Sequence, residues 1–147
     1  MPESSPSNAI DPVTLELLQE TLISVVREMR ATLVSTAYST IIQEAHDFPC
    51  VLIDGRGEIV AQAEDNPSHI FPIPWSVREM FTHFPDDIHP GDVFLHNDPY
   101  TGGTHLNDIA MIFPVFSEDR LVVFPVVRAQ WGDVGGTTPG SIYGKST

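Results

Sequence analysis

The chain begins with a long stretch whose apolar residues recur at helical spacing. Asp11-Pro12 is a strong helix start, because Asp caps the free N–H groups of a first turn and Pro suits the first helical position. Residues 13–43 contain neither Gly nor Pro. This pattern predicts a helix over about residues 12–43. Its main apolar stripe comprises Leu15, Leu18, Leu22, Val25 and Met29.

The length of this helix indicates whether another chain covers its apolar surface. About 32 residues at 1.5 Å each span ~48 Å, whereas a compact domain of this size is about 40 Å across. The remaining apolar positions widen the stripe beyond one face, which is too broad for an overhang in water. Either the helix breaks near Ser35-Thr36, or another chain covers it.

The rest of the chain alternates strand patterns with turns. The β-rich runs at residues 48–54 and 58–63 flank a tight turn at residues 54–57. Residues 66–74 carry three prolines and are expected to form an ordered loop, followed by a short helix over residues 74–84. Further strands are expected at residues 92–97, 105–116 and 121–129. This order predicts an α+β fold with a mainly antiparallel sheet.

The length of 147 residues suits one domain or part of one. We expect a flexible tail at residues 1–10, a single domain at residues 11–142 and a second tail at residues 143–147. The glycine-rich residues 132–147 have the composition of a loop. Because little apolar sequence follows the last strand, the fold is expected to be incomplete without a partner subunit.

Composition excludes several classes of function. Seven Lys and Arg against 20 Asp and Glu give a net charge of 7 − 20 = −13, which opposes binding to nucleic acid and to anionic membranes. The longest apolar run, residues 121–127, is far shorter than the roughly 20 residues of a membrane span. A single cysteine, Cys50, favours a reducing, cytoplasmic setting, and its place in a predicted strand indicates a buried hydrophobe.

Chemically active residue types concentrate in residues 96–108, around a Gly-Gly turn. His105 and Asp108 are three apart, so in a strand they would lie on opposite faces and bind one ion only if the backbone turned between them. A histidine with a carboxylate suits Mn, Fe or Zn. The alternative is that Asn97, Asp98 and Asp108 are turn residues that bond to loop amides.

A second polar cluster, residues 128–136, directly follows a strand. Gln130 and Asp133 are expected to face the first cluster across the end of the sheet. Arg128 suits a carboxylate or phosphate through its forked guanidinium, or equally an Arg–Asp pair at a strand end. His69, in the proline-rich loop, is either a buried hydrogen-bonded histidine or a site residue.

Several motifs together resemble one family. They are Asp-Pro-Val-Thr at residues 11–14, Asp-Phe-Pro-Cys at 47–50, Asn-Asp-Pro-Tyr at 97–100, Gly-Gly-Thr-His-Leu-Asn-Asp at 102–108 and Asp-Val-Gly-Gly at 133–136. They resemble the N-terminal part of the hydantoinase B/oxoprolinase family. Chains of that family have several hundred residues, so the resemblance implies either a truncated chain or a separate small subunit from a split gene.

The resemblance also implies a metal site. In related acetone carboxylases a metal ion is held by a His-x-x-Asp pair and a later His. The pair corresponds to His105 and Asp108, and the later His to Gln130, where this sequence departs from the pattern. A Mn or Zn site would then be absent, weaker, or completed by a larger partner.

The activity that the resemblance implies is that of a small subunit of a multi-subunit, ATP-dependent ketone carboxylase, such as one converting acetophenone, bicarbonate and ATP to benzoylacetate. ATP and Mg would be used by larger hydantoinase A-like and B-like partners, and this chain would be inactive alone. His105, Asn97 and Arg128 are the candidate polar contacts, and Asp108 a ligand or base. The alternatives are a fragment of a hydantoinase or 5-oxoprolinase-type ATP-dependent amidohydrolase, a non-catalytic assembly subunit, and a free-standing metal-binding domain.

Overall fold

The structure of the chain is a computed structural model that describes residues 10–135. In chain order its elements are α1 (Pro12–Thr36), α2 (Thr40–Gln43), β1 (Cys50–Ile53), β2 (Ile59–Gln62), α3 (Pro67–Ile70), α4 (Ile73–His83), β3 (Phe94–His96), β4 (Asp108–Ile112), β5 (Val115–Ser117) and β6 (Arg120–Gln130). Apart from Ile10, both predicted tails lie outside the described residues. So does most of the glycine-rich segment expected at residues 132–147.

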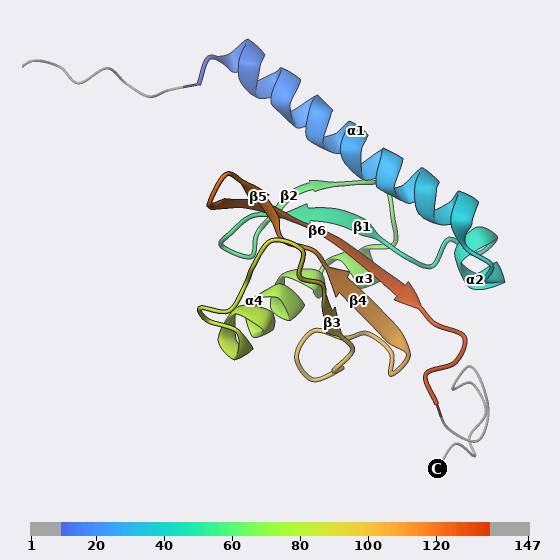
Figure 1. The fold of residues 1–147 in the computed structure, drawn as a ribbon. Coiled ribbons are helices and arrows are strands. Elements are labelled where there is room, and N and C mark those ends of the chain that lie inside the picture. Colours follow the sequence, from blue (N-terminus) through green and yellow to red (C-terminus); the bar gives the residue numbers. More distant parts are fainter. Residues whose placement is uncertain (1–9, 136–147) are drawn as a thin grey trace, which may run out of the picture.

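One antiparallel sheet organises the molecule. Its strand order is β2-β1-β6-β4-β3, and β5 pairs with β6 off this path. Every paired strand runs antiparallel to its neighbour. Helix α1 crosses one face of the sheet, and α3 and α4 lie on the other (Figure 1). The predicted α+β fold with a mainly antiparallel sheet is therefore confirmed.

The two faces of the sheet form two apolar layers. Successive residues of a strand point to opposite faces, so β1 contributes Cys50 and Leu52 to the layer under α1. Its other two residues, Val51 and Ile53, join the layer under α4. Long strand β6 divides in the same way, and Ala129 belongs to the α1 layer whereas Val126 belongs to the α4 layer. The sheet therefore has no polar face along its centre.

Side chains at both ends of helix α1 form hydrogen bonds with the backbone. Asp11 Oδ1 accepts hydrogen bonds from the N–H groups of Val13 and Thr14 at 3.0 and 3.2 Å, which confirms the predicted cap. At the other end, the hydroxyls of Ser35 and Thr36 donate to the carbonyl of Thr32. Such back-bonding weakens a helix. The chain leaves α1 after Thr36 and resumes as α2, so the helix predicted over residues 12–43 is divided. Of the two alternatives that the sequence left open, the break near Ser35-Thr36 is present.

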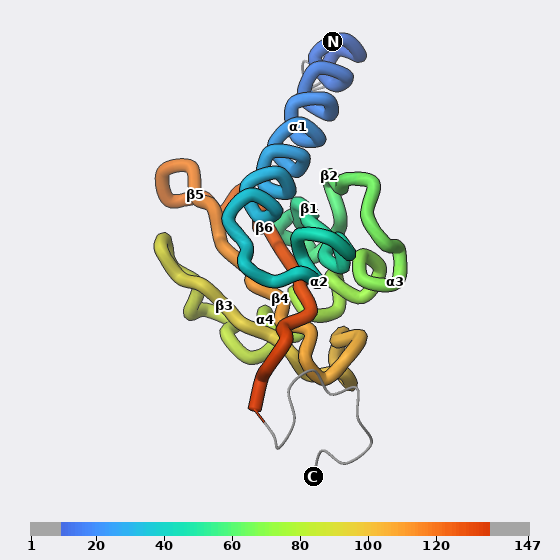
Figure 2. Tube along the Cα trace, turned by 90° about the vertical axis from the view of Figure 1, so that its right-hand side faces the viewer, coloured from blue at the N-terminus to red at the C-terminus, as the bar shows by residue number. Residues whose placement is uncertain are grey.

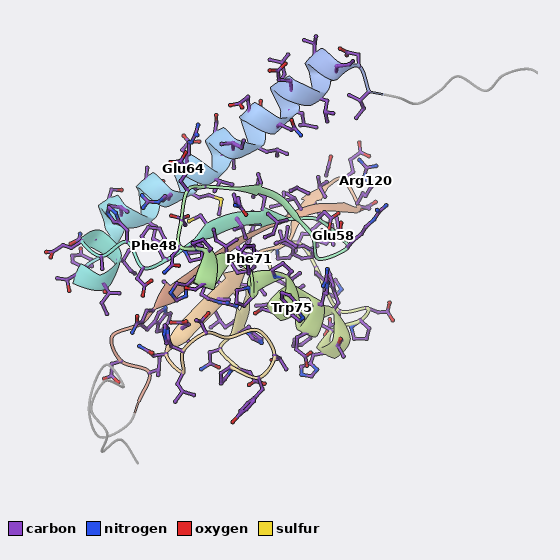
Figure 3. All side chains as sticks on the ribbon, turned by 180° about the vertical axis from the view of Figure 1, so that it is seen from behind. Phe48, Glu58, Glu64, Phe71, Trp75 and Arg120 are labelled. Atoms are coloured by element: carbon purple, nitrogen blue, oxygen red, sulfur yellow. The ribbon has the colours of Figure 1, made fainter. Side chains whose placement is uncertain are left out.

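The break shortens the helix without covering its first half. Its 25 residues span about 37 Å, and the N-terminal turns project beyond the sheet (Figure 2). The side chains of these turns stand clear of the other elements (Figure 3). Leu15 and Leu18 are 44% and 46% exposed, whereas Val26, where α1 crosses the sheet, is fully buried. That a partner covers this half remains a prediction.

Two element predictions were wrong in detail. Residues 66–74 are not a loop throughout, because Asn66 Oδ1 accepts from the N–H of Ser68 and starts the short helix α3. The strand expected at residues 105–116 begins only at Asp108, after a turn, and Pro114 separates β4 from β5. The hairpin of β1 and β2 and the helix at α4 are confirmed. Among residues 10–135, none of the helices combines the length and hydropathy that crossing a bilayer requires.

Candidate metal centre

Two segments far apart in the sequence bring two histidines and a carboxylate together. His69 comes from α3, His105 from the turn before β4, and Asp108 is the first residue of β4. One possible ligand atom from each lies within 4.8 Å of the others. His69 and Asp108 are buried, whereas the His105 side chain is 53% exposed. The cluster therefore opens to solvent on the side of His105.

A turn places His105 and Asp108 on the same side of the chain. The N–H of Asp108 donates to the carbonyl of His105 at 3.2 Å. In return, Asp108 Oδ2 accepts from the backbone N–H of His105 at 2.9 Å and lies 3.2 Å from His105 Nδ1. His105 and Asp108 could bind one ion only if the backbone turned between them, and the structure has this turn.

His69 occupies the middle of the cluster, between two carboxylates. Its Nε2 lies 2.9 Å from Asp47 Oδ1, and its Nδ1 lies 3.5 Å from Asp108 Oδ2. The sequence left open whether His69 is a buried hydrogen-bonded histidine or a site residue. In the structure it is buried and paired with carboxylates, and its role as a site residue stays a prediction. Asp47 was not predicted. It precedes β1, and only the antiparallel order β1-β6-β4 brings it near α3 and β4.

The charged groups of the cluster stabilise the ionised forms of their neighbours. The pKa of His69 is raised, chiefly because its ring contacts the Asp108 carboxylate and secondly because Asp47 is near, although burial opposes the shift. Burial acts to raise the pKa of Asp108, but hydrogen bonds from His69 and from the His105 backbone outweigh it and hold that pKa below its ordinary value. Asp108 is therefore an ionised carboxylate at neutral pH.

The donor set fits a divalent transition metal. Two imidazoles and one carboxylate suit Mn, Fe or Zn better than Mg. The Asp47–His69 contact has the arrangement in which a carboxylate orients a metal-binding histidine through its other ring nitrogen. In addition, Asp108 Oδ1 is buried and, among residues 10–135, finds no hydrogen-bond partner. This oxygen is left over as a ligand atom.

Gln130 lies directly across the sheet from the cluster. It is the strand partner of Asp108 in the β4–β6 pairing, and paired residues of antiparallel strands point to the same face. The expectation that Gln130 faces the first cluster across the sheet end is confirmed. Asp133 does not do so, because it is exposed and accepts instead from the N–H of Gly135.

Arg128 approaches the cluster from the protein interior rather than from solvent. It is 1% exposed, and its Nη2 donates to the hydroxyl of Ser76 at 2.5 Å. Burial lowers its pKa to about 10, which the Asp108 charge partly offsets, so the guanidinium stays protonated at neutral pH. Asn97 is exposed beyond β3, and no hydrogen bond or ion pair of the cluster includes it. Its predicted role as a polar contact stays a prediction.

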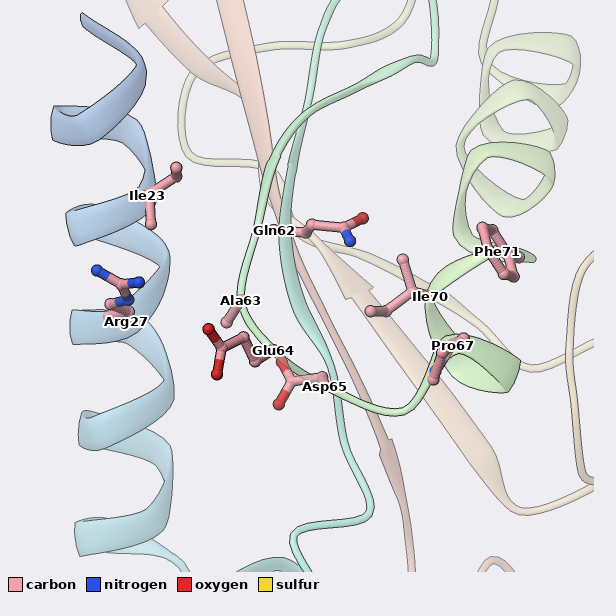
Figure 4. A pocket seen from close by; sticks show the side chains of 9 residues that line it. All are labelled: Ile23, Arg27, Gln62, Ala63, Glu64, Asp65, Pro67, Ile70 and Phe71. Carbon is pink, nitrogen blue, oxygen red and sulfur yellow. The ribbon is translucent and has the colours of Figure 1, made fainter. Parts of the chain in front are cut away.

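A cavity between described residues lies away from the cluster. It has a volume of about 310 Å³ and separates α1 from the segment that connects β2 to α3 (Figure 4). It contains no residue of the His69–His105–Asp108 cluster. Of its two acidic residues, Glu64 and Asp65, the second is paired with Arg30 at 2.8 Å. The shape of the surface and the chemistry of the side chains therefore point to different places, and the chemistry is the more specific guide.

The chain is a three-layer domain with two histidines and a carboxylate at one end of its sheet. Comparison with known proteins identifies its family. Residues 11–147 match the Hydantoinase B/oxoprolinase family. The chain belongs to this family.

Individual relatives agree with that assignment. The chain is 38% identical over 135 residues to 5-oxoprolinase 1 of Arabidopsis thaliana, covering 92% of this chain and 11% of that protein. It superposes on the crystal structure of the ATP-dependent caprolactamase from Pseudomonas jessenii with a TM-score of 0.84 and 33% identity, over 95% of this chain and 25% of the other. A nucleotide-free acetone carboxylase shares the fold, with a TM-score of 0.76 and 24% identity over 89% of this chain and 18% of the other.

These relatives are much longer than the chain. The chain spans about a quarter or less of the length of each of these three proteins.

Proposed function

We propose that this chain supplies the metal-binding part of an ATP-dependent enzyme that acts on a cyclic amide, and that it works with larger hydantoinase A-like and B-like subunits. The observation that carries the proposal is the convergence of His69, His105 and Asp108 within 4.8 Å. Support for the substrate class comes from 5-oxoprolinase and caprolactamase, whose names specify lactams.

The residues of the chain have distinct tasks in this proposal. Asp47 accepts from Nε2 of His69 and turns Nδ1 toward Asp108. Asp108 holds the His105 turn with Oδ2 and keeps Oδ1 available. A divalent cation held by these groups would act as a Lewis acid on a substrate carbonyl oxygen. The exposed side of His105 is the open side of the cluster, and a substrate would approach there.

The ketone carboxylase predicted from the sequence is the second candidate. The same Lewis-acid chemistry serves a ketone as it becomes an enolate. Support for this candidate is a shared fold with acetone carboxylase, whereas the lactam-directed relatives are also closer in sequence. A role as an acetophenone carboxylase subunit therefore remains a prediction.

One set of assays separates the two candidates. The chain is purified together with its larger subunits, and ATP consumption is measured with 5-oxoproline, with caprolactam, and with acetophenone plus bicarbonate. We expect turnover with a lactam and its loss by at least about 100-fold in His105→Ala, since even loss of an outer partner of a metal site costs 10–100-fold. His83→Ala is the matched control, because His83 is solvated on α4.

Either of two results would contradict the proposal. Turnover with acetophenone and bicarbonate alone would favour the carboxylase. Full lactam turnover by the His105→Ala complex would make the chain a non-catalytic assembly subunit.

A further inference from the structure

The loop of residues 98–104 carries the chain from β3 to His105, and it is held against the start of α4. The hydroxyl of Ser76, in the first turn of α4, donates to the carbonyl of Gly102 at 3.3 Å. Ser76 is fully buried although it is polar. The same hydroxyl accepts from Nη2 of Arg128. A continuous chain of hydrogen bonds thus runs from β6 through α4 to the loop.

Gly102 fits its position for two reasons. Its φ of 118° lies in the region that favours glycine. A Cβ built there would also lie 2.7 Å from Ser76 Oγ and 2.8 Å from Ser76 N, which is closer than real Cβ atoms approach. The loop can therefore contact α4 this closely only because residue 102 has no side chain.

The anchor of this chain of bonds is built into the sheet. Arg128 pairs with Ala110 across β4 and β6. Arg128 is 1% exposed, so it cannot reach a substrate in solvent. Its Nε and Nη1 find no partner among residues 10–135, which leaves the Ser76 hydroxyl as the group that orients it. Loss of that hydroxyl would release both ends of the chain.

We propose that Arg128 and Ser76 are positioning residues, which dock the Gly102 loop on α4 and thereby hold His105 in place as a metal ligand. The inference rests on the proposed function, because it concerns how the metal site is assembled. It changes the role predicted for Arg128 from a substrate contact to a group that acts through the loop. A second contact, between His96 Nε2 and Thr101 Oγ1 at 2.9 Å, ties the loop to β3 but does not reach α4.

The test measures metal affinity in the full chain, by calorimetric titration with MnCl2 or ZnCl2 after removal of bound metal. We expect Ser76→Ala and Gly102→Ala to weaken metal binding about 10- to 100-fold, as loss of outer partners of a metal site does. Gly91→Ala is the matched control. Gly91 also has a positive φ, of 94°, but nothing lies within 4 Å of a Cβ there.

A double variant separates positioning from general stability. If Ser76 acts through His105, Ser76→Ala will have no further effect on metal affinity in a His105→Ala background. A Ser76→Ala chain that melts at a lower temperature but keeps wild-type metal affinity overturns the proposal. So does an equal loss of affinity in the single and the double background.

Hydrogen exchange keeps the proposal distinct from the proposed function. If the wild-type chain binds neither metal, the proposed function fails, and docking is then judged from the amide of His105 alone. Faster exchange of that amide in Ser76→Ala than in Gly91→Ala supports docking of the loop by Ser76. Equal exchange in the two variants overturns it.

Discussion

The two faces of the sheet are made from alternate residues of the same strands, yet they differ in chemistry. Under α1 the packed layer is apolar, and Cys50, Leu52 and Ala129 are typical. The buried Asp65 carboxylate on this side is paired with Arg30 of α1. Under α3 and α4 the layer is apolar in its middle but ends in buried His69, Asp108 and Arg128. Charges are costly to bury unless they are paired. The first face is therefore mainly an apolar packing layer, whereas the end of the second holds buried ionisable groups whose charges depend on one another.

The largest expected effect comes from removing the central carboxylate. Asp108→Ala leaves His69 and Arg128 without their common counter-charge, and breaking a buried pair in this way costs about 3–5 kcal/mol. Leu52→Ala on the other face costs a similar amount, about 2–5 kcal/mol, by leaving a cavity. The two variants differ in their response to metal. In urea unfolding, MnCl2 should stabilise Leu52→Ala but not Asp108→Ala.

This pair of variants tests whether the metal ion binds at the polar end of one face. A metal-induced gain in stability that persists in Asp108→Ala would place the bound ion outside the cluster.

The next effect is a pH dependence that belongs to the polar end of one face. Because the pKa of His69 is raised above 6.5 by Asp108 and Asp47, its contribution is complete below pH 6.5 and is lost as pH rises through its folded value. The contribution of Asp108, whose pKa is lowered below 3.8, is complete above that pH. Without metal, the free energy of unfolding should therefore fall from pH 6 to pH 8.

The slope should disappear in one histidine variant and survive in another. Urea unfolding in EDTA at pH 6, 7 and 8 is expected to show no such fall in His69→Asn. His83→Asn should retain it, because that side chain is 66% exposed. An unchanged slope in His69→Asn would assign the pH dependence to another group.

A smaller effect is expected at Gln130, the position where the sequence resemblance predicts a histidine ligand in the family. Gln130 faces the same side as its strand partner Asp108, and imidazole is a stronger ligand than an amide for Mn or Zn. Gln130→His should tighten metal binding by about tenfold, which is ~1.4 kcal/mol. Gln62→His on β2, an exposed position, is the control. Equal affinities in a calorimetric titration would mean that residue 130 does not reach the metal.

The smallest effect is expected at the thiol of the apolar face. Cys50 is fully buried, and burial raises its pKa to about 12, with Asp65 adding to the shift. Because the thiolate is the reactive form, a disulfide reagent at pH 8 should label almost none of the native chain and all of it in urea. Rapid labelling of the native chain would show that the layer under α1 opens readily.

Local patterns in the sequence predict most of the fold. The Asp11 cap, the hairpin and α4 follow from turn residues and apolar spacing, which act over a few residues. The short helix α3 was missed because three prolines suggest a loop, although Pro67 suits the first turn of a helix that Asn66 caps. The late start of β4 was missed because the sequence from His105 onward has a strand pattern, whereas the turn between His105 and Asp108 is evident only in the structure.

The candidate site was predicted only where its residues are close in sequence. His105 and Asp108 form a visible pair at a spacing of three, and Gln130 follows from a resemblance to the family. His69 and Asp47 join them through strand order and through packing of α3 on the sheet. Such contacts depend on the complete topology, and no local pattern encodes them. The burial of Arg128 depends likewise on α4 covering the end of β6.

The central claim is that His69, His105 and Asp108 together bind one divalent metal ion. The most direct measurement is equilibrium dialysis of the full chain against MnCl2, with the bound metal quantified per chain. The result expected is one equivalent of Mn²⁺ in the wild type and in His83→Ala, and a loss of binding by at least about 100-fold in each of His69→Ala, His105→Ala and Asp108→Asn. Absence of binding in the wild type, or undiminished binding in the three variants, would contradict the claim.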